Sequence, residues 1–114
     1  MSILVLLDDL LFRSKLDAAA ASTGAAIRVM SRVPQPADDW PLVLVDLNAS
    51  TFDPIAAVAE IRAATPHAAI IGFCSHVQTD LMASARQAGC TEVLPRSAFV
   101  QRLPELLAAA TTQR

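Results

Sequence analysis

The chain contains short segments that are almost continuously apolar, without alternation between apolar and polar residues. These segments are residues 3–7, 42–45 and 69–73, with a shorter version at residues 91–94. Such runs are typical of strands that are covered on both faces, as in a parallel sheet. Residues 27–30 alternate instead, which predicts an edge strand with one face in water. The pattern therefore predicts five strands.

Helical periodicity with recognisable ends follows two of these strands. Asp9 can cap a helix, and Gly24 stands just beyond its end, where glycine favours the left-handed conformation. Asp53 can cap a second helix, with Pro54 at the first helical position and Pro66 as its stop. The buried face of the first helix is expected to carry Phe12, Leu16, Ala19 and Ala20.

Two further helices are expected in the second half of the chain. Thr79 or Asp80 begins one of them, which ends at Gly89. The last helix is expected to begin near Pro104, because proline is tolerated in the first turn and disfavoured further along. Residues 97–101 are then predicted to form a turn before it.

The connection between the second and third predicted strands is rich in proline. Residues 31–41 contain three prolines, which leave room for about one helical turn at most. Trp40 in this stretch is expected to cover the sheet edge. The alternation of strands and helices predicts an α/β, doubly wound parallel sheet of five strands with a shortened second helix.

Composition agrees with one compact domain over residues 1–114. Of the 114 residues, 54% are hydrophobic and 18% are charged, so a buried core is feasible. Nine basic and eleven acidic residues give a net charge of −2, which argues against nucleic acid as a partner.

The chain shows no sign of a membrane segment or of a secretory signal. No run approaches the ~20 apolar residues of a membrane span, and Asp8 and Asp9 interrupt the N-terminal run too early for a signal peptide. Cys74 and Cys90 are too few for a disulfide scaffold and are typical of reduced thiols. A cytoplasmic protein without membrane contact is expected.

Acidic residues follow two of the apolar segments. Asp8 and Asp9 come after the first strand and Asp46 ends the third. These carboxylates meet at one edge if the two strands are neighbours, as in the flavodoxin-like order 2-1-3-4-5. Oxygen ligands of this kind suit Mg²⁺, and such carboxylates can also act as nucleophiles towards phosphorus. From spacing alone, a helix cap and a polar strand end explain these residues equally well.

Several blocks of the sequence occur together and in order over one domain length. They are Ile-Leu-Val-Leu-Leu-Asp-Asp at residues 3–9, Leu-Val-Leu-Val-Asp-Leu-Asn at 42–48, Asp53, and Ala-Gly-Cys-Thr-Glu-Val-Leu-Pro-Arg at 88–96. In this combination the whole chain resembles the receiver domain of two-component response regulators. The resemblance implies the strand order 2-1-3-4-5.

The resemblance also implies a phosphorylation site. Asp46 would accept a phosphoryl group from a partner histidine kinase, and Asn48 would offer its backbone carbonyl to Mg²⁺. Alignment on the family's basic residue in the first helix, here Arg13, makes Asp8 the acidic metal ligand. Alignment on the acidic pair restores Asp9 as well, so both assignments stay open and Asp8 is favoured.

Several positions depart from the family pattern, two of them among the expected site residues. The hydroxyl residue after the fourth strand is replaced by Cys74, with Ser75 one place later, and a thiol is a weaker donor. The lysine after the fifth strand is replaced by Arg96, which keeps the charge but not the compact ammonium group. Cys74 follows Phe73 and is expected to be a buried packing residue.

Three hypotheses for the function follow from these residues. The first is a receiver that is phosphorylated on Asp46, whose partner is a histidine kinase or another signalling protein, with a homodimer left open. The second is a pseudo-receiver, which binds proteins without phosphorylation; Cys74 and Arg96 favour it. A small α/β enzyme is the third hypothesis. It has no identifiable base or nucleophile besides Asp46, so activity would extend at most to phosphoryl acceptance and self-dephosphorylation.

Overall fold

Five parallel strands form one sheet in the order β2-β1-β3-β4-β5. The computed structural model describes residues 2–34 and 40–112. The strands are β1 (Ile3–Leu6), β2 (Ile27–Met30), β3 (Leu42–Asp46), β4 (Ala69–Cys74) and β5 (Glu92–Pro95). The helices are α1 (Leu10–Thr23), α2 (Pro54–Ala64), α3 (Thr79–Ala88) and α4 (Arg96–Thr112). The predicted α/β class and the strand order are confirmed.

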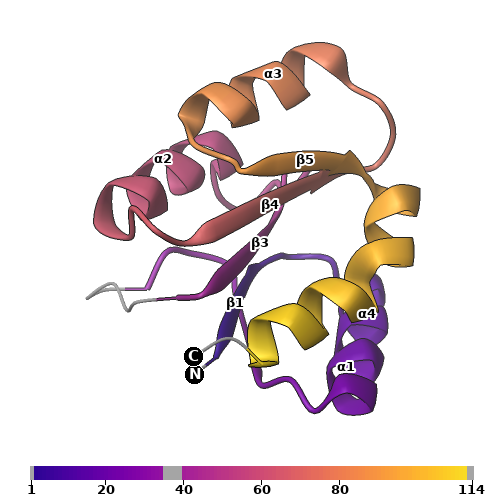
Figure 1. The fold of residues 1–114 in the computed structure, drawn as a ribbon. Coiled ribbons are helices and arrows are strands. Elements are labelled where there is room, and N and C mark those ends of the chain that lie inside the picture. The colour runs from indigo at the N-terminus through magenta and orange to yellow at the C-terminus, as the bar shows by residue number, and fades with distance from the viewer. Residues whose placement is uncertain (1, 35–39, 113–114) are drawn as a thin grey trace.

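The helices cover the sheet on both faces. In Figure 1, α1 and α4 lie side by side on one face, and α2 and α3 lie together on the other. Every residue of β1 and of β3 is buried, as expected for strands with helices on either side. The edge strand β2 is only partly covered, which agrees with its alternating sequence. Each face therefore has its own apolar core, divided by the sheet.

The ends of the first three helices follow their local sequence. The Asp9 side chain accepts hydrogen bonds from the backbone N–H groups of Leu11 (3.0 Å) and Phe12 (3.1 Å), so it caps α1. Gly24 ends that helix with φ of 72°. Asp53 caps α2 by accepting from the N–H of Ala56 at 3.2 Å. These predicted ends are confirmed, as is the start of α3 at Thr79.

The expected start of the last helix was wrong. Helix α4 begins at Arg96, eight residues before Pro104, which lies inside the helix, and residues 97–101 are helical. Proline in a helix interior costs about 3 kcal/mol because a backbone hydrogen bond is lost. Burying a large apolar side chain contributes about 1.5–3 kcal/mol. Phe99, Leu103 and Leu107, spaced along one face, are each at most 2% exposed, and their burial outweighs the proline.

The connection from β2 to β3 contains no helix in its described residues, 31–34 and 40–41. The remaining residues of this predicted one-turn stretch, 35–39, lie outside the described part of the chain. Trp40 is 5% exposed and belongs to the core on the α2 and α3 side, as expected of a covering residue.

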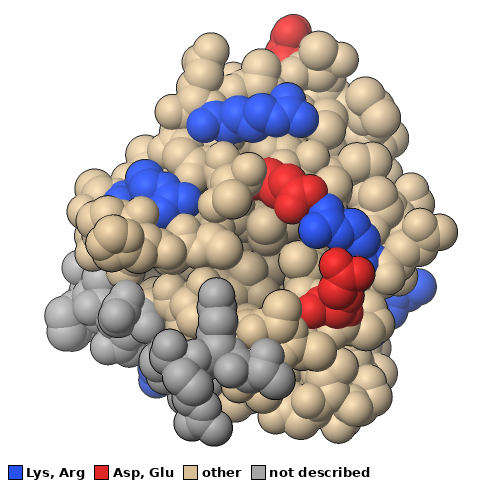
Figure 2. Space-filling model, in the orientation of Figure 1, with Lys and Arg blue, Asp and Glu red and all other residues tan. Residues whose placement is uncertain are grey.

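The surface carries interspersed charges. On the face drawn in Figure 2, one blue side chain adjoins red ones, whereas the other blue patches stand apart on uncharged surface, and the described residues there form no broad basic patch. Within residues 2–34 and 40–112, none of the helices is both long and apolar enough to cross a membrane.

Candidate functional site

Asp46 is the buried acid at the carboxyl edge of the sheet. It ends β3, between β1 and β4, and is 2% exposed. Its Oδ1 accepts a hydrogen bond from the N–H of Asn48 at 2.9 Å. Burial raises the pKa of Asp46, because the charged form loses water. The Asn48 N–H and the positive charge of Arg96 act in the opposite direction, while Asp8 and Asp9 add to the rise in pKa.

Asp8 anchors the loop that follows β3. Its Oδ2 accepts hydrogen bonds from the N–H groups of Ser50 and Thr51 and from the Thr51 hydroxyl, each at 2.9 Å. The Thr51 N–H is the main reason why the pKa of Asp8 lies below its ordinary value, with partial burial working against it. Asp8 is therefore held as a carboxylate beside Asp46.

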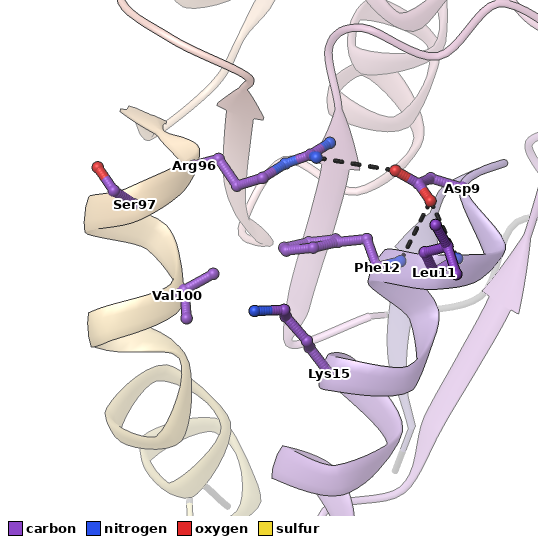
Figure 3. Close-up of a pocket in the computed structure, with 7 residues that line it drawn as sticks. All are labelled: Asp9, Leu11, Phe12, Lys15, Arg96, Ser97 and Val100. Atoms are coloured by element: carbon purple, nitrogen blue, oxygen red, sulfur yellow. Dashed lines mark hydrogen bonds and ion pairs between the residues drawn. The ribbon is translucent and has the colours of Figure 1, made fainter.

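Asp9 points to a different part of the molecule from Asp8. Besides capping α1, its Oδ2 lies 3.7 Å from Nη1 of Arg96. Figure 3 shows this pair spanning the gap between the beginnings of α1 and α4. The two adjacent acids thus have separate partners, one on the β3–α2 loop and the other on α4.

Arg96 is held in place from two sides. Its guanidinium carbon lies 4.5 Å from the centroid of the Phe12 ring, and Nη1 pairs with Asp9. Its Nε is buried and has no hydrogen-bond partner among the described residues. An unpaired buried donor costs roughly 1–3 kcal/mol. Arg96 therefore carries an unused donor close to the acidic edge.

Cys74 is a buried thiol at the end of β4. Its Sγ donates to the carbonyl oxygen of His76 at 3.0 Å, and its side chain is fully covered, which confirms the expected burial. Burial is the main reason why its pKa is raised, and the charge of Asp46 adds to this. The next residue, Ser75, is exposed, with Oγ 3.2 Å from Nδ1 of His76.

Asn48 connects the acidic edge with the loop after β4. Its Oδ1 accepts from the N–H of Ser75 at 2.6 Å, and its Nδ2 donates to Oε1 of Gln78 at 3.0 Å. Its own N–H is the group bonded to Asp46. One residue therefore links the buried carboxylate to the segment that leads into α3.

Asp8, Asp46 and Asn48 supply oxygen donors of the kind that a hard divalent cation prefers. Asp46 fits such an ion for a further reason, because the one hydrogen bond shown from a described residue to its carboxylate goes to Oδ1, which leaves Oδ2 available as a ligand. Among the described residues there is no group of three His, Cys, Asp or Glu side chains arranged to hold a metal ion. Any cation here would therefore rely on two carboxylates together with a backbone carbonyl.

Comparison with known proteins gives distant relatives. No family model matches the chain. It is 26% identical over 96 residues to the transcription factor SKN7 of Chaetomium thermophilum, across 84% of this chain and 12% of that protein. The chain thus spans about an eighth of the curated relative it matches.

Solved structures share the fold. One is a response regulator from Burkholderia pseudomallei with a phosphorylated aspartic acid, calcium ion and citrate; it has a TM-score of 0.77 at 21% identity and matches over 97% of this chain and 66% of that one. Another, the BeF3-activated DrrB receiver domain, has a TM-score of 0.80 at 11% identity over 98% of this chain and 97% of that one. The chain has the receiver fold.

Within this receiver fold, sequence reasoning missed the partners of the predicted residues. No sequence signal pointed to Thr51, to Gln78 or to the stacking of Phe12 on Arg96. Thr51 lies 43 residues from Asp8 in the sequence, and no local signal pairs them. The periodicity of α1 predicted Phe12 as a core residue, but it gave no sign of the arginine above the ring.

Proposed function

We propose that this chain is a receiver domain of two-component signalling, which accepts a phosphoryl group on Asp46 from a partner histidine kinase in the cytoplasm. The observation that carries the proposal is the geometry of Asp46. One carboxylate oxygen is held by the Asn48 N–H and the other has no partner among the described residues. Asp46 ends β3 at the strand edge, and the charges of Arg96, Asp8 and Asp9 act on its carboxyl group.

The chemistry requires an ionised, positioned carboxylate. Oδ2 of Asp46 would form a bond to phosphorus as the bond between phosphorus and the kinase histidine nitrogen breaks. The imidazole leaves as the neutral ring after taking up a proton. The Asn48 N–H keeps the carboxylate oriented for this step, which produces an acyl phosphate on the chain.

Mg²⁺ is the proposed cofactor. Asp8, Asp46 and the backbone carbonyl of Asn48 would hold it, and the bound ion would neutralise charge on the phosphoryl oxygens. A cation here would also restore the charged form of Asp46, which burial disfavours. The similar Burkholderia pseudomallei protein was solved with calcium and a phosphorylated aspartic acid. Asp9 is the weaker candidate ligand, because it caps α1 and faces Arg96.

Arg96 and Ser75 would complete the phosphoryl site, with Cys74 at the position where the family has its hydroxyl residue. Arg96 would pair with the phosphoryl oxygens after leaving Asp9, and its planar fork can contact two oxygens at once. The thiol of Cys74 donates to the His76 carbonyl, so it does not replace a hydroxyl. Ser75 is the hydroxyl nearest in sequence and is exposed.

A pseudo-receiver that binds partner proteins without phosphorylation is the second candidate. The observation in its favour is the fixed position of Arg96, which is paired with Asp9 and stacked on Phe12. A cation held in this way is not free to follow a phosphoryl group.

Labelling separates the two functions. Incubation with acetyl phosphate and Mg²⁺ should add one phosphoryl group, measured by intact mass, and Asp46→Asn should abolish it. Asp17→Asn is the matched control, because Asp17 is an exposed acid on α1 that pairs with Arg13. Absence of labelling in the natural chain, together with no NMR response to beryllium fluoride, would favour the pseudo-receiver. Labelling that survives Asp46→Asn would contradict the assigned acceptor.

A further inference from the structure

A cleft of about 620 Å³ lies between α1 and α4, beside the acidic edge of the sheet. Figure 3 shows its lining: Phe12 lies between the two helices, Arg96 on one side of it and Lys15 on the other, with Val100 facing them from α4. The volume falls within the range of about 300–1,000 Å³ typical of small-molecule sites. A cavity of this size suits a compact ligand better than a flat protein surface.

The charges of the cleft favour an anion. Lys15 and Arg96 line it together with a single acid, Asp9. Lys15 has no ion-pair partner within residues 2–34 and 40–112. Arg96 lies 3.7 Å from Asp9, longer than a charge-assisted hydrogen bond, and its side chain is 30% exposed. With two cations and one acid, the lining has an excess of one positive charge, which a ligand with one negative charge would balance. A carboxylate would supply hydrogen-bond acceptors for both cations.

The apolar residues of the cleft favour a ligand with an apolar body. Leu11, Phe12 and Val100 contribute to the lining. Leu11 is 86% exposed, so its side chain stands in solvent at the rim of the cleft. An apolar group in the cleft would cover it while the anionic group faced the two cations.

From these features we propose that the cleft binds a small organic carboxylate with an aromatic or aliphatic body. Arg96 and Lys15 hold the carboxylate, and Leu11, Phe12 and Val100 contact the body. The inference goes beyond the proposed phosphorylation, because it requires neither Mg²⁺ nor Asp46. Binding is therefore to be measured on the unphosphorylated chain and on Asp46→Asn, so that failure of one proposal leaves the other intact.

NMR titration with matched probes tests the charge requirement. Phenylacetate and hexanoate should shift the backbone amide resonances of Phe12, Lys15, Ser97 and Val100 in a saturable manner. Phenylacetamide and hexanamide keep the shape but lack the charge. Their affinity should be lower by a factor of about ten or more, the factor expected for one charge-assisted hydrogen bond. Acetate, which lacks the body, should also bind more weakly than phenylacetate.

Variants locate the site. Lys15→Gln and Arg96→Gln should each weaken phenylacetate binding about tenfold, and Val100→Phe should block binding by filling the cleft. Arg13→Gln is the matched control, because Arg13 is a cation on α1 that does not line this cleft, and it should leave binding unchanged. Lys15 is exposed, so Lys15→Gln should fold normally even if Arg96→Gln does not.

Several results would overturn the inference. Equal affinity for phenylacetate and phenylacetamide would remove the anion requirement. Loss of binding in Arg13→Gln as large as in Lys15→Gln would show a general charge effect. Absence of saturable shifts with both carboxylates at millimolar concentration would exclude a site of this class. Concentration-dependent dimerisation that Leu11→Glu abolishes, seen by sedimentation without ligand, would assign the cleft to a second copy of the chain.

Discussion

The guanidinium of Arg96 lies over the ring of Phe12, with its carbon 4.5 Å from the ring centroid. The ring belongs to an aromatic cluster, because Phe73 lies 5.2 Å away and Phe99 6.1 Å away between centroids. A cation over an aromatic face gains about 0.5–2 kcal/mol, and the ion pair with Asp9 holds the same group. The guanidinium of Arg96 is thus held against the core between α1 and α4 in the absence of a ligand.

Because Arg96 is held by Phe12 and Asp9, we expect only a weak structural response of the chain to a phosphoryl group. Changing Cys74→Thr together with Arg96→Lys supplies a hydroxyl and a flexible ammonium group. We expect beryllium fluoride to cause larger NMR shifts on the face formed by α3, β5 and α4 in this double variant than in the natural chain. In the natural chain, phosphorylation should change partner affinity by less than the roughly 1–3 kcal/mol common for allosteric coupling. A large response in the unaltered chain would contradict this prediction.

The buried carboxyl of Asp46 should make stability depend on pH. Its pKa lies above the ordinary 3.8, so the folded chain binds the proton more tightly than the unfolded chain. The free energy of unfolding should therefore fall as pH rises from 3.8 through the folded-state pKa. Asp46→Asn should raise the free energy of unfolding at neutral pH, and the gain should vanish below pH 3.8. Urea unfolding across this range, without divalent cations, measures it; a destabilised Asp46→Asn at neutral pH would be the contrary result.

Asp8 should show the opposite dependence. Its pKa is lowered by the hydrogen bonds from Thr51 and Ser50, so its stabilisation is present above pH 3.8 and is lost as pH falls through the folded-state pKa. Asp8→Asn should lower the free energy of unfolding at neutral pH by roughly 1 kcal/mol, because the loop loses charge-assisted bonds at a partly exposed site. The same urea series gives the value, and Asp17→Asn again serves as control.

Pro104 should limit the stability of α4. Replacing it by alanine restores a backbone donor inside the helix, although it also frees the unfolded chain. Pro104→Ala should therefore raise the free energy of unfolding by about 1–2 kcal/mol. Phe99→Ala should lower it by about 3–5 kcal/mol, because it removes a fully buried ring from the same helix. Chemical denaturation of both variants measures whether burial of Phe99 stabilises α4 by more than Pro104 destabilises it. A lower free energy of unfolding in Pro104→Ala would contradict the expected cost of the proline.

Features set by neighbouring residues were predictable from the sequence. The apolar runs identify the central strands because helices cover both of their faces. Asp9, Gly24 and Asp53 mark helix ends because a capping side chain or a left-handed turn acts within a few residues of its own position. The meeting of Asp8 and Asp46 at one edge was expected once their strands were taken as neighbours, and the order β1 beside β3 confirms that they are.

Features set by partners far along the chain were decided only by the tertiary structure. The sequence placed the last helix at Pro104, but the burial of Phe99 and Leu103 extends it back to Arg96. The sequence predicted Asp9 as a helix cap and favoured Asp8 as the metal ligand, but it did not show that Asp8 holds the loop after β3 or that Asp9 faces α4. In both cases the deciding contacts join residues that are close only after the sheet forms, and for α4 their energy exceeds the local preference against an interior proline.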